Sequence, residues 1–148
     1  MSTSIKKKKR FAIGIDAGLT TGVYVYDRTT RKIIALFSSS FWEAYGLVLR
    51  DYTPEDTLIV VEKPRKFFVY DRAKDKDPKA RERRAFNAGE NNREATLLIE
   101  GFGKAGFEVR TQTPEGEKWN AAYFQTITRC DLRTNEHQRD AARLVFGL

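Results

Sequence analysis

The sequence predicts one α/β domain with a five-stranded mixed sheet flanked by helices. Two observations lead to this prediction. The length of 148 residues matches the size of a single compact domain, for which one hydrophobic core suffices. Three β-type segments stand in a row near the N-terminus, and helical and β-type segments alternate after them. Consecutive strands form an antiparallel meander, whereas strands separated by helices join the sheet in parallel through right-handed crossovers.

The three opening strands are indicated by their β-forming residues and by the turns between them. Phe11–Asp16 alternates weakly, and Gly22–Tyr26 follows it after a Gly-Leu-Thr-Thr-Gly turn, so these two segments predict a hairpin. Lys32–Ser38 contains two isoleucines, a leucine and a phenylalanine and follows a polar connection. We therefore expect a third strand there.

A helix and a fourth strand come next. Ser40–Asp51 carries apolar side chains at helical spacing behind a serine, which is a favourable N-cap. Thr57–Val61 is a continuous run of mostly β-branched residues, as expected of a strand that is covered on both faces.

The second half of the chain begins with a charged, turn-rich stretch over residues 63–87, where we expect a mobile loop or a ragged helix outside the core. Regular elements return after it. They are a helix over Asn92–Lys104, a strand over Phe107–Thr111, a helical segment that opens at Pro114 and runs through Trp119, Tyr123 and Phe124, and a last helix over Asn135–Phe146.

Composition excludes several classes of protein. Hydrophobic residues make up 41% of the chain, which argues against wholesale disorder. No apolar run approaches the roughly 20 residues of a membrane span, and no apolar region follows the basic N-terminus as in a secretory signal. The single Cys130 cannot form an internal disulfide or a cysteine-based zinc site. We expect a soluble intracellular protein with no membrane partner.

The net charge of +7 is concentrated in two places. Residues 6–10 contribute +5, and we expect residues 1–10 to form a disordered basic tail before a single domain over residues 11–148. Lys63–Arg84 contributes +6 from ten basic and four acidic residues, so the rest of the chain carries −4. Two basic blocks on an acidic body indicate a polyanionic partner, most simply nucleic acid. Simple solubility is the alternative.

Four residues could carry chemistry. Asp16 ends the first predicted strand and Glu62 ends the fourth, while His137 and Asp140 share one face of the last predicted helix. If the first and fourth strands are neighbours, the two carboxylates meet at one end of the sheet and repel each other unless a cation lies between them. Oxygen-rich sites of this kind suit Mg²⁺ or Mn²⁺. The alternative for Asp16 is a structural role as the cap of its turn.

Five short segments also form an ordered set. They are Ile13–Gly22, Val60–Glu62, Gly89–Val109, Thr113–Lys118 and His137–Ala141. In this order they resemble the motifs of the RuvC-like Holliday junction resolvases, which belong to the ribonuclease-H-like superfamily. The resemblance covers nearly the whole chain from Phe11 onward.

The chain departs from the family pattern at three points. The turn from Asp16 to Thr21 is one residue shorter than in typical bacterial members, and the stretch between Lys118 and His137 is shortened. His137 also stands where many relatives have aspartate. The chain is therefore similar to the small variants of this family that phages carry.

The resemblance implies a ribonuclease-H-like fold and a metal-dependent endonuclease that resolves Holliday junctions in DNA recombination. It implies that Asp16, Glu62, His137 and Asp140 hold two Mg²⁺ or Mn²⁺ ions, and that Lys118 neutralises charge on the scissile phosphate. An ordinary solvated lysine is the alternative for Lys118. Two alternatives remain for the function: a broader debranching nuclease that cuts forks, flaps and Y-junctions, and a non-catalytic protein of the same fold that binds branched DNA.

Basic and aromatic residues beyond Glu62 are the predicted DNA contacts, because aromatic rings stack on unpaired bases while cations hold phosphates. For the rings, a place in the core is the alternative. The predicted contacts are Lys63, Arg65, Lys66, Phe67, Phe68, Arg81, Arg83 and Arg84.

A homodimer is expected as well. A four-way junction offers two symmetry-related strands, and one chain contains a single set of acids, so a two-fold dimer would deliver two sites. The helix over Asn92–Lys104 is the predicted interface. The resemblance places such an enzyme in the cytoplasm of a bacterium or of a phage-infected cell.

Overall fold

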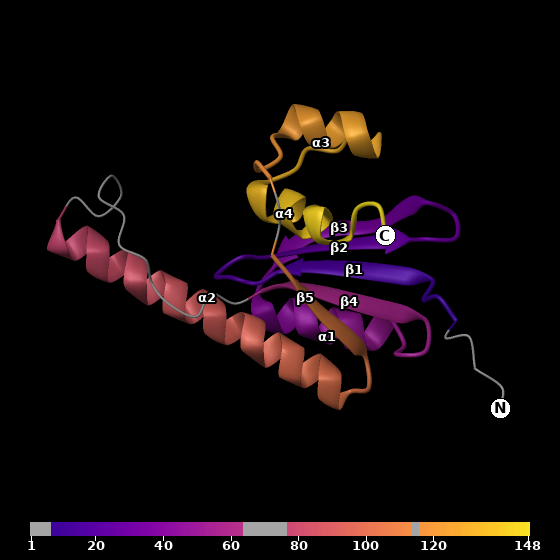
Figure 1. Cartoon of the computed structure of the whole chain (residues 1–148), viewed down its shortest axis with the longest axis horizontal. Coiled ribbons are helices and arrows are strands. Elements are labelled where there is room, and N and C mark those ends of the chain that lie inside the picture. The colour runs from indigo at the N-terminus through magenta and orange to yellow at the C-terminus, as the bar shows by residue number, and fades with distance from the viewer. Residues whose placement is uncertain (1–6, 64–76, 114–115) are drawn as a thin grey trace.

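The computed structural model describes residues 7–63, 77–113 and 116–148, with side chains for all of these except 87–91 (Figure 1). Five strands and four helices make up these residues. In chain order they are β1 (Phe11–Asp16), β2 (Thr21–Asp27), β3 (Lys32–Ser39), α1 (Phe41–Asp51), β4 (Thr57–Glu62), α2 (Pro78–Lys104), β5 (Glu108–Gln112), α3 (Ala121–Thr128) and α4 (Glu136–Val145).

The strands form one mixed sheet in the order β3-β2-β1-β4-β5. The first three strands are antiparallel neighbours, whereas β4 lies parallel to β1 and β5 lies parallel to β4. The predicted meander, the parallel crossovers and the five-stranded mixed sheet are therefore confirmed.

Each face of the sheet carries its own core. On one face, the helices α1 and α2 cover Ile13, Ile15, Ile59 and Val61. On the other face, α4 covers the alternate positions of the same strands (Figure 1). The helix α3 lies beyond α4, and its buried Phe124 reaches the second core. Successive side chains on a strand point to opposite faces of the sheet, so every second residue of a strand faces α4.

The helix α2 begins at Pro78, well before the start expected at Asn92. Asp77 accepts a hydrogen bond from the backbone N–H of Ala80, and proline stands at the start of the helix, where its missing N–H costs nothing. The helical alternative is therefore correct for residues 78–87. In Figure 1 this end of α2 projects beyond the sheet. Residues 64–76 of the same charged stretch lie outside the described part of the chain.

Two further boundaries differ from expectation. The helix α3 begins at Ala121, after the N-cap Asn120, and Trp119 precedes it; the expected start at Pro114 lies outside the described residues. The body also reaches further toward the N-terminus than Phe11. The Lys9 ammonium donates to the carbonyl oxygens of Pro54 and Glu55, at 2.8 and 3.0 Å, and Arg10 forms an ion pair of 2.9 Å with buried Asp27. Residues 1–6 lie outside the described residues.

In the described parts of the chain, the helices are too short or too polar to span a lipid bilayer.

Candidate active site

Asp16 and Glu62 meet at one end of the sheet. Ile15 pairs with Val61 in the parallel ladder of β1 and β4, so the next residue on each strand is an acid. Both side chains point to the α4 face, because they follow the alternation of Gly14 and Val60 on their strands. The two carboxyl groups are close enough for Glu62 to raise the pKa of Asp16. The strand neighbours predicted from sequence are correct.

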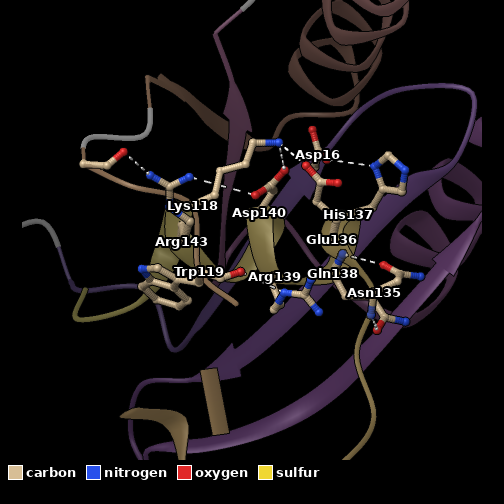
Figure 2. Close-up of polar contacts among 11 residues, drawn as sticks. Asp16, Lys118, Trp119, Asn135, Glu136, His137, Gln138, Arg139, Asp140 and Arg143 are labelled. Carbon is tan, nitrogen blue, oxygen red and sulfur yellow. Dashed lines mark hydrogen bonds and ion pairs between the residues drawn. The ribbon is translucent and has the colours of Figure 1, made fainter. Parts of the chain in front are cut away.

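The helix α4 adds two residues to this end of the sheet. His137 Nδ1 lies 3.2 Å from Asp16 Oδ2 (Figure 2). Asp140 is mostly buried, and its charge acts on Asp16. All four residues singled out in the sequence are therefore gathered in one place.

Two glycines allow α4 to lie directly on the sheet. A Cβ atom added at Gly14 would come within 2.1 Å of the carbonyl oxygen of Ala141, and one at Gly22 within 2.1 Å of the carbonyl oxygen of His137. Both contacts involve helix backbone, which cannot move aside as a flexible side chain can. Any larger residue at these positions would lift α4 away from Asp16.

The first turn of α4 is fixed by its cap. Asn135 accepts a hydrogen bond from the backbone N–H of Gln138, whose side chain accepts one from the backbone N–H of Asn135, completing a capping box. The Asn135 amide also donates to Ser38 Oγ on β3, at 2.7 Å. These contacts set the register of His137 and Asp140 over the sheet.

Burial and the neighbouring acids raise the pKa of Asp16 to about 8. Burial is the largest cause, followed by the hydrogen bond and the charge of Glu62 and by the charge of Asp140; the positive charge of Lys118 acts in the opposite direction. Burial and like charges both disfavour a carboxylate. Without a cation, the cluster therefore retains a proton near neutral pH.

Lys118 lies at the edge of the cluster. Its ammonium forms an ion pair with Glu136 and lies 3.3 Å from Asp140 Oδ2 (Figure 2). The hydrogen bond to Glu136 is the main reason that the pKa of Lys118 is raised, and the same bond lowers the pKa of Glu136. Glu136 was not identified from the sequence, although its place immediately before His137 on the first turn of the helix was a usable signal.

Arg143 is a second residue that was not identified from the sequence. Its side chain is only 7% exposed, and one guanidinium nitrogen lies 3.9 Å from Asp140 Oδ1. Another donates to the carbonyl oxygen of Gly116, at 3.2 Å (Figure 2). Arg143 therefore ties the segment that carries Lys118 to the helix that carries Asp140. The signal was an arginine three positions after an acid, the spacing of an ion pair on a helix.

The donor atoms at this end of the sheet are of the type that a hard divalent cation prefers, although in the described parts of the chain no three His, Cys, Asp or Glu side chains form a ready-made metal-binding group. Asp140 Oδ1 is buried and accepts no hydrogen bond from the described residues, so beyond the long ion pair to Arg143 this oxygen is available as a ligand. Asp16 and Glu62 add carboxylate oxygens, and His137 adds a ring nitrogen. Carboxylate oxygens are the ligands that Mg²⁺ and Mn²⁺ prefer.

Four of the eight predicted DNA contacts lie within the described residues. Lys63 is exposed directly beyond Glu62, and its backbone N–H donates to the carbonyl oxygen of Gln112 on β5. Arg81, Arg83 and Arg84 lie on the projecting end of α2, the first two of them exposed. The remaining predicted contacts lie outside the described residues; they are Arg65, Lys66, Phe67 and Phe68.

Comparison with known proteins gives a match at the level of structure. No protein-family model matches the chain, and no curated protein matches its sequence. A solved structure described as T. thermophilus RuvC in complex with Holliday junction substrate is similar, with a TM-score of 0.58 and 14% sequence identity. The alignment covers 90% of this chain and 88% of that chain. The similarity extends over most of the chain, and this chain therefore has a RuvC-like fold, with a five-stranded mixed sheet flanked by helices.

Proposed function

We propose that this protein is a metal-dependent endonuclease that hydrolyses phosphodiester bonds in branched DNA, with the four-way Holliday junction as its substrate. The convergence of Asp16, Glu62 and Asp140 carries the proposal. Three acids from β1, β4 and α4 are held together, and burial with the charges of its neighbours raises the pKa of Asp16 to about 8. A cation site explains such an arrangement better than a structural role. The solved structure of similar fold contains a Holliday junction, which supports branched DNA as the substrate.

Asp16, Glu62, Asp140 and His137 would hold two Mg²⁺ or Mn²⁺ ions. Bound at such a site, two divalent ions lower the pKa of an attacking water and stabilise the departing oxygen of an in-line displacement. The packing of the chain holds the side chains that would bind these ions in place. The glycines of β1 and β2 seat α4 against the sheet, and the capping box fixes the turn on which His137 stands.

Lys118 is the proposed phosphate contact. Its pKa is raised by Glu136, so it is positively charged at any pH at which the enzyme would work. Arg143 and Glu136 hold it beside Asp140, where its charge can stabilise the negative charge that develops on the phosphate. Glu136 would release the ammonium as a phosphate oxygen takes its place.

The proposal is tested by cleavage of labelled four-way junctions, three-way junctions, forks, flaps and linear duplexes in Mg²⁺ and in Mn²⁺. We expect paired incisions in the four-way junction and none in linear duplex. Equal cutting of forks, flaps and Y-junctions would replace the resolvase by a broader debranching nuclease. Tight binding of junctions without cleavage in either metal would leave a branched-DNA-binding protein.

The basic end of α2 is expected to bind phosphates. Replacing Arg81, Arg83 and Arg84 together by glutamine should weaken binding to all DNA. It should also reduce the slope of log K against log salt by about 0.9 for each phosphate that the variant no longer neutralises, because neutralising a phosphate releases condensed counterions. Fluorescence anisotropy over a salt series measures both effects.

A triple variant that removes three other exposed charges is the control for net charge. Arg50, Lys104 and Arg133 suit this purpose, since they lie on α1, at the end of α2 and before α4. If the affinity and the slope fall equally in both triple variants, the effect reflects net charge and the proposed role of α2 in DNA binding is wrong.

A homodimer with α2 at its interface is also proposed. Ala95, Leu98 and Phe102 are buried in the core, so the opposite side of the helix is the free one, and on it Leu97 is 42% exposed. We expect a dimer in light scattering at micromolar concentration and a shift toward monomer in Leu97→Arg. Leu49→Arg, the same change on an exposed position of α1, should remain dimeric. A monomeric wild-type protein that makes both incisions would overturn the proposal.

A further inference from the structure

A recess lies at the end of the sheet away from the acids. It is a groove of about 760 Å³ between the β2–β3 hairpin and the connection from α3 to α4. The strand register fixes its position. Asp16 pairs with Gly22 at the site end of the ladder, whereas Tyr26, which lines the groove, pairs with Ala12 toward the other end. The groove is therefore separate from the candidate active site.

Apolar side chains line much of this groove, and three of them are exposed. Ile34 is 49% exposed, Leu132 is 59% exposed and Phe146 is 45% exposed, although they come from three distant parts of the chain. Large apolar side chains gathered around one recess commonly mark a binding surface. The volume is also in the range of sites that bind small ligands, and so suffices for one side chain of a partner.

The groove is also lined by basic residues. Arg31, Lys32 and Arg129 line it, against the single acid Asp131. Arg31 has a φ of 58° and Arg129 a φ of 55°, and they are the two non-glycine residues with positive φ in the described part of the chain. This left-handed conformation is disfavoured for residues with a Cβ atom, and such backbone strain tends to collect at functional sites. Two arginines stand where glycine or asparagine would be favoured, and both line the same groove.

The local structure limits which kind of ligand the groove can bind. β3 is an edge strand, but Ile34 falls at a register shift in its ladder with β2 and has no partner there, and a bulge of this kind discourages a further strand from pairing. A DNA backbone would match the arginines, but it would gain nothing from the apolar lining and would meet Asp131. A peptide with both apolar and acidic side chains matches both features of the groove.

We propose that this groove is a docking site for an acidic segment of a partner protein, with an aliphatic or aromatic side chain in the recess and its carboxylates on Arg31 and Arg129. The proposal does not depend on the nuclease function, because the groove shares no residue with the carboxylate cluster.

The test is a selection from a displayed library of random peptides on the full-length protein, followed by binding measurements with the enriched peptides. The key variant replaces Arg31 and Arg129 by asparagine, which removes both charges and adopts the left-handed conformation more readily than arginine does. Its Tm should therefore be unchanged or higher. We expect enriched peptides that combine Asp or Glu with Leu, Ile or Phe, and an affinity at least about tenfold lower for the double variant.

Two further variants sharpen the test. Leu132→Ser should also weaken binding of the enriched peptides, whereas glutamine at Arg50 and Arg110, two exposed arginines outside the groove, should not. The proposal fails if no peptide is enriched, if the enriched peptides lack the acidic and apolar pattern, or if they bind the Arg31/Arg129 variant as tightly as the wild type. It also fails if that variant loses affinity for duplex DNA alone, which would make the groove part of the DNA-binding surface.

Discussion

Asp16→Asn is expected to reduce junction cleavage at least about a hundredfold and to leave junction binding as tight as in the wild type or tighter. Changing a residue that only contacts a metal ligand typically lowers metal affinity or activity about 10–100-fold. Loss of a ligand itself should lower the activity at least as much. Binding should survive, because removing a negative charge lowers the repulsion of DNA phosphates. Cleavage assays and anisotropy on the same four-way junction measure the two effects.

The same substitution should raise the Tm of the metal-free protein at alkaline pH. The pKa of Asp16 is about 8 in the folded protein and close to the ordinary 3.8 in the unfolded chain. Between these values the unfolded chain has released the proton while the folded protein still binds it, so Asp16 destabilises the fold increasingly as the pH rises. In EDTA, the difference in Tm between Asp16→Asn and the wild type should be small near pH 4 and largest near pH 8.

Divalent cations should reverse that difference. A ligand that binds only the folded state raises its stability by mass action, so Mg²⁺ or Mn²⁺ should raise the Tm of the wild type at pH 8 and change that of Asp16→Asn much less. Asp51→Asn, the same change on an exposed residue of α1, is the control and should behave as the wild type in both measurements. Cleavage that survives in Asp16→Asn, Glu62→Gln and Asp140→Asn alike would contradict the proposed site.

Gly22→Ala is expected to disrupt the site and destabilise the protein through a single methyl group. The added Cβ would lie 2.1 Å from the carbonyl oxygen of His137 and 2.9 Å from the backbone nitrogen of Gln138. Overpacking of this kind typically costs about 1–3 kcal/mol and shifts backbone. The helix α4 should therefore move, and cleavage and the stabilisation by Mn²⁺ should fall together. Thermal unfolding with and without Mn²⁺, alongside the junction cleavage assay, measures these effects.

Gly46→Ala is the matched control. Nothing lies within 4 Å of a Cβ built at Gly46, which is an exposed position within α1. Alanine is favoured over glycine inside a helix by up to about 1 kcal/mol, so this variant should be slightly more stable and as active as the wild type. A Gly22→Ala protein with the stability and activity of Gly46→Ala would show that α4 does not rest on the sheet as described.

The strands could be predicted because they follow from local patterns: weak alternation indicated β1, and a continuous run of mostly β-branched residues indicated β4. Strands separated by a helix join in parallel, so Asp16 and Glu62 were expected at one end of the sheet if β1 and β4 were neighbours, as they are. The start of α2 could not be predicted in the same way. Its first turns are stabilised by the Asp77 cap and by Pro78, and they lack the apolar stripe that identifies a helix packed on a core.

The roles of residues that act through distant contacts could not be predicted from sequence patterns. Glu136 and Arg143 matter because the segment around Lys118 folds back onto α4, and nothing in the local sequence encodes that approach. Gly14 and Gly22 are an intermediate case. Their place on the α4 face follows from strand alternation, but the need for a bare backbone there becomes visible only once the helix is docked.

The chain order of the site has a consequence for biosynthesis. Asp16 and His137 are 121 positions apart, on the first strand and the last helix. During synthesis on a ribosome, β1, β2 and β4 are made long before α4. Until then Asp16 and Glu62 lack His137 and Asp140, and the apolar residues that α4 covers stay exposed. A nascent or interrupted chain therefore carries no assembled carboxylate cluster. If the protein is the proposed nuclease, it cannot cut DNA before α4 has been made and has docked on the sheet.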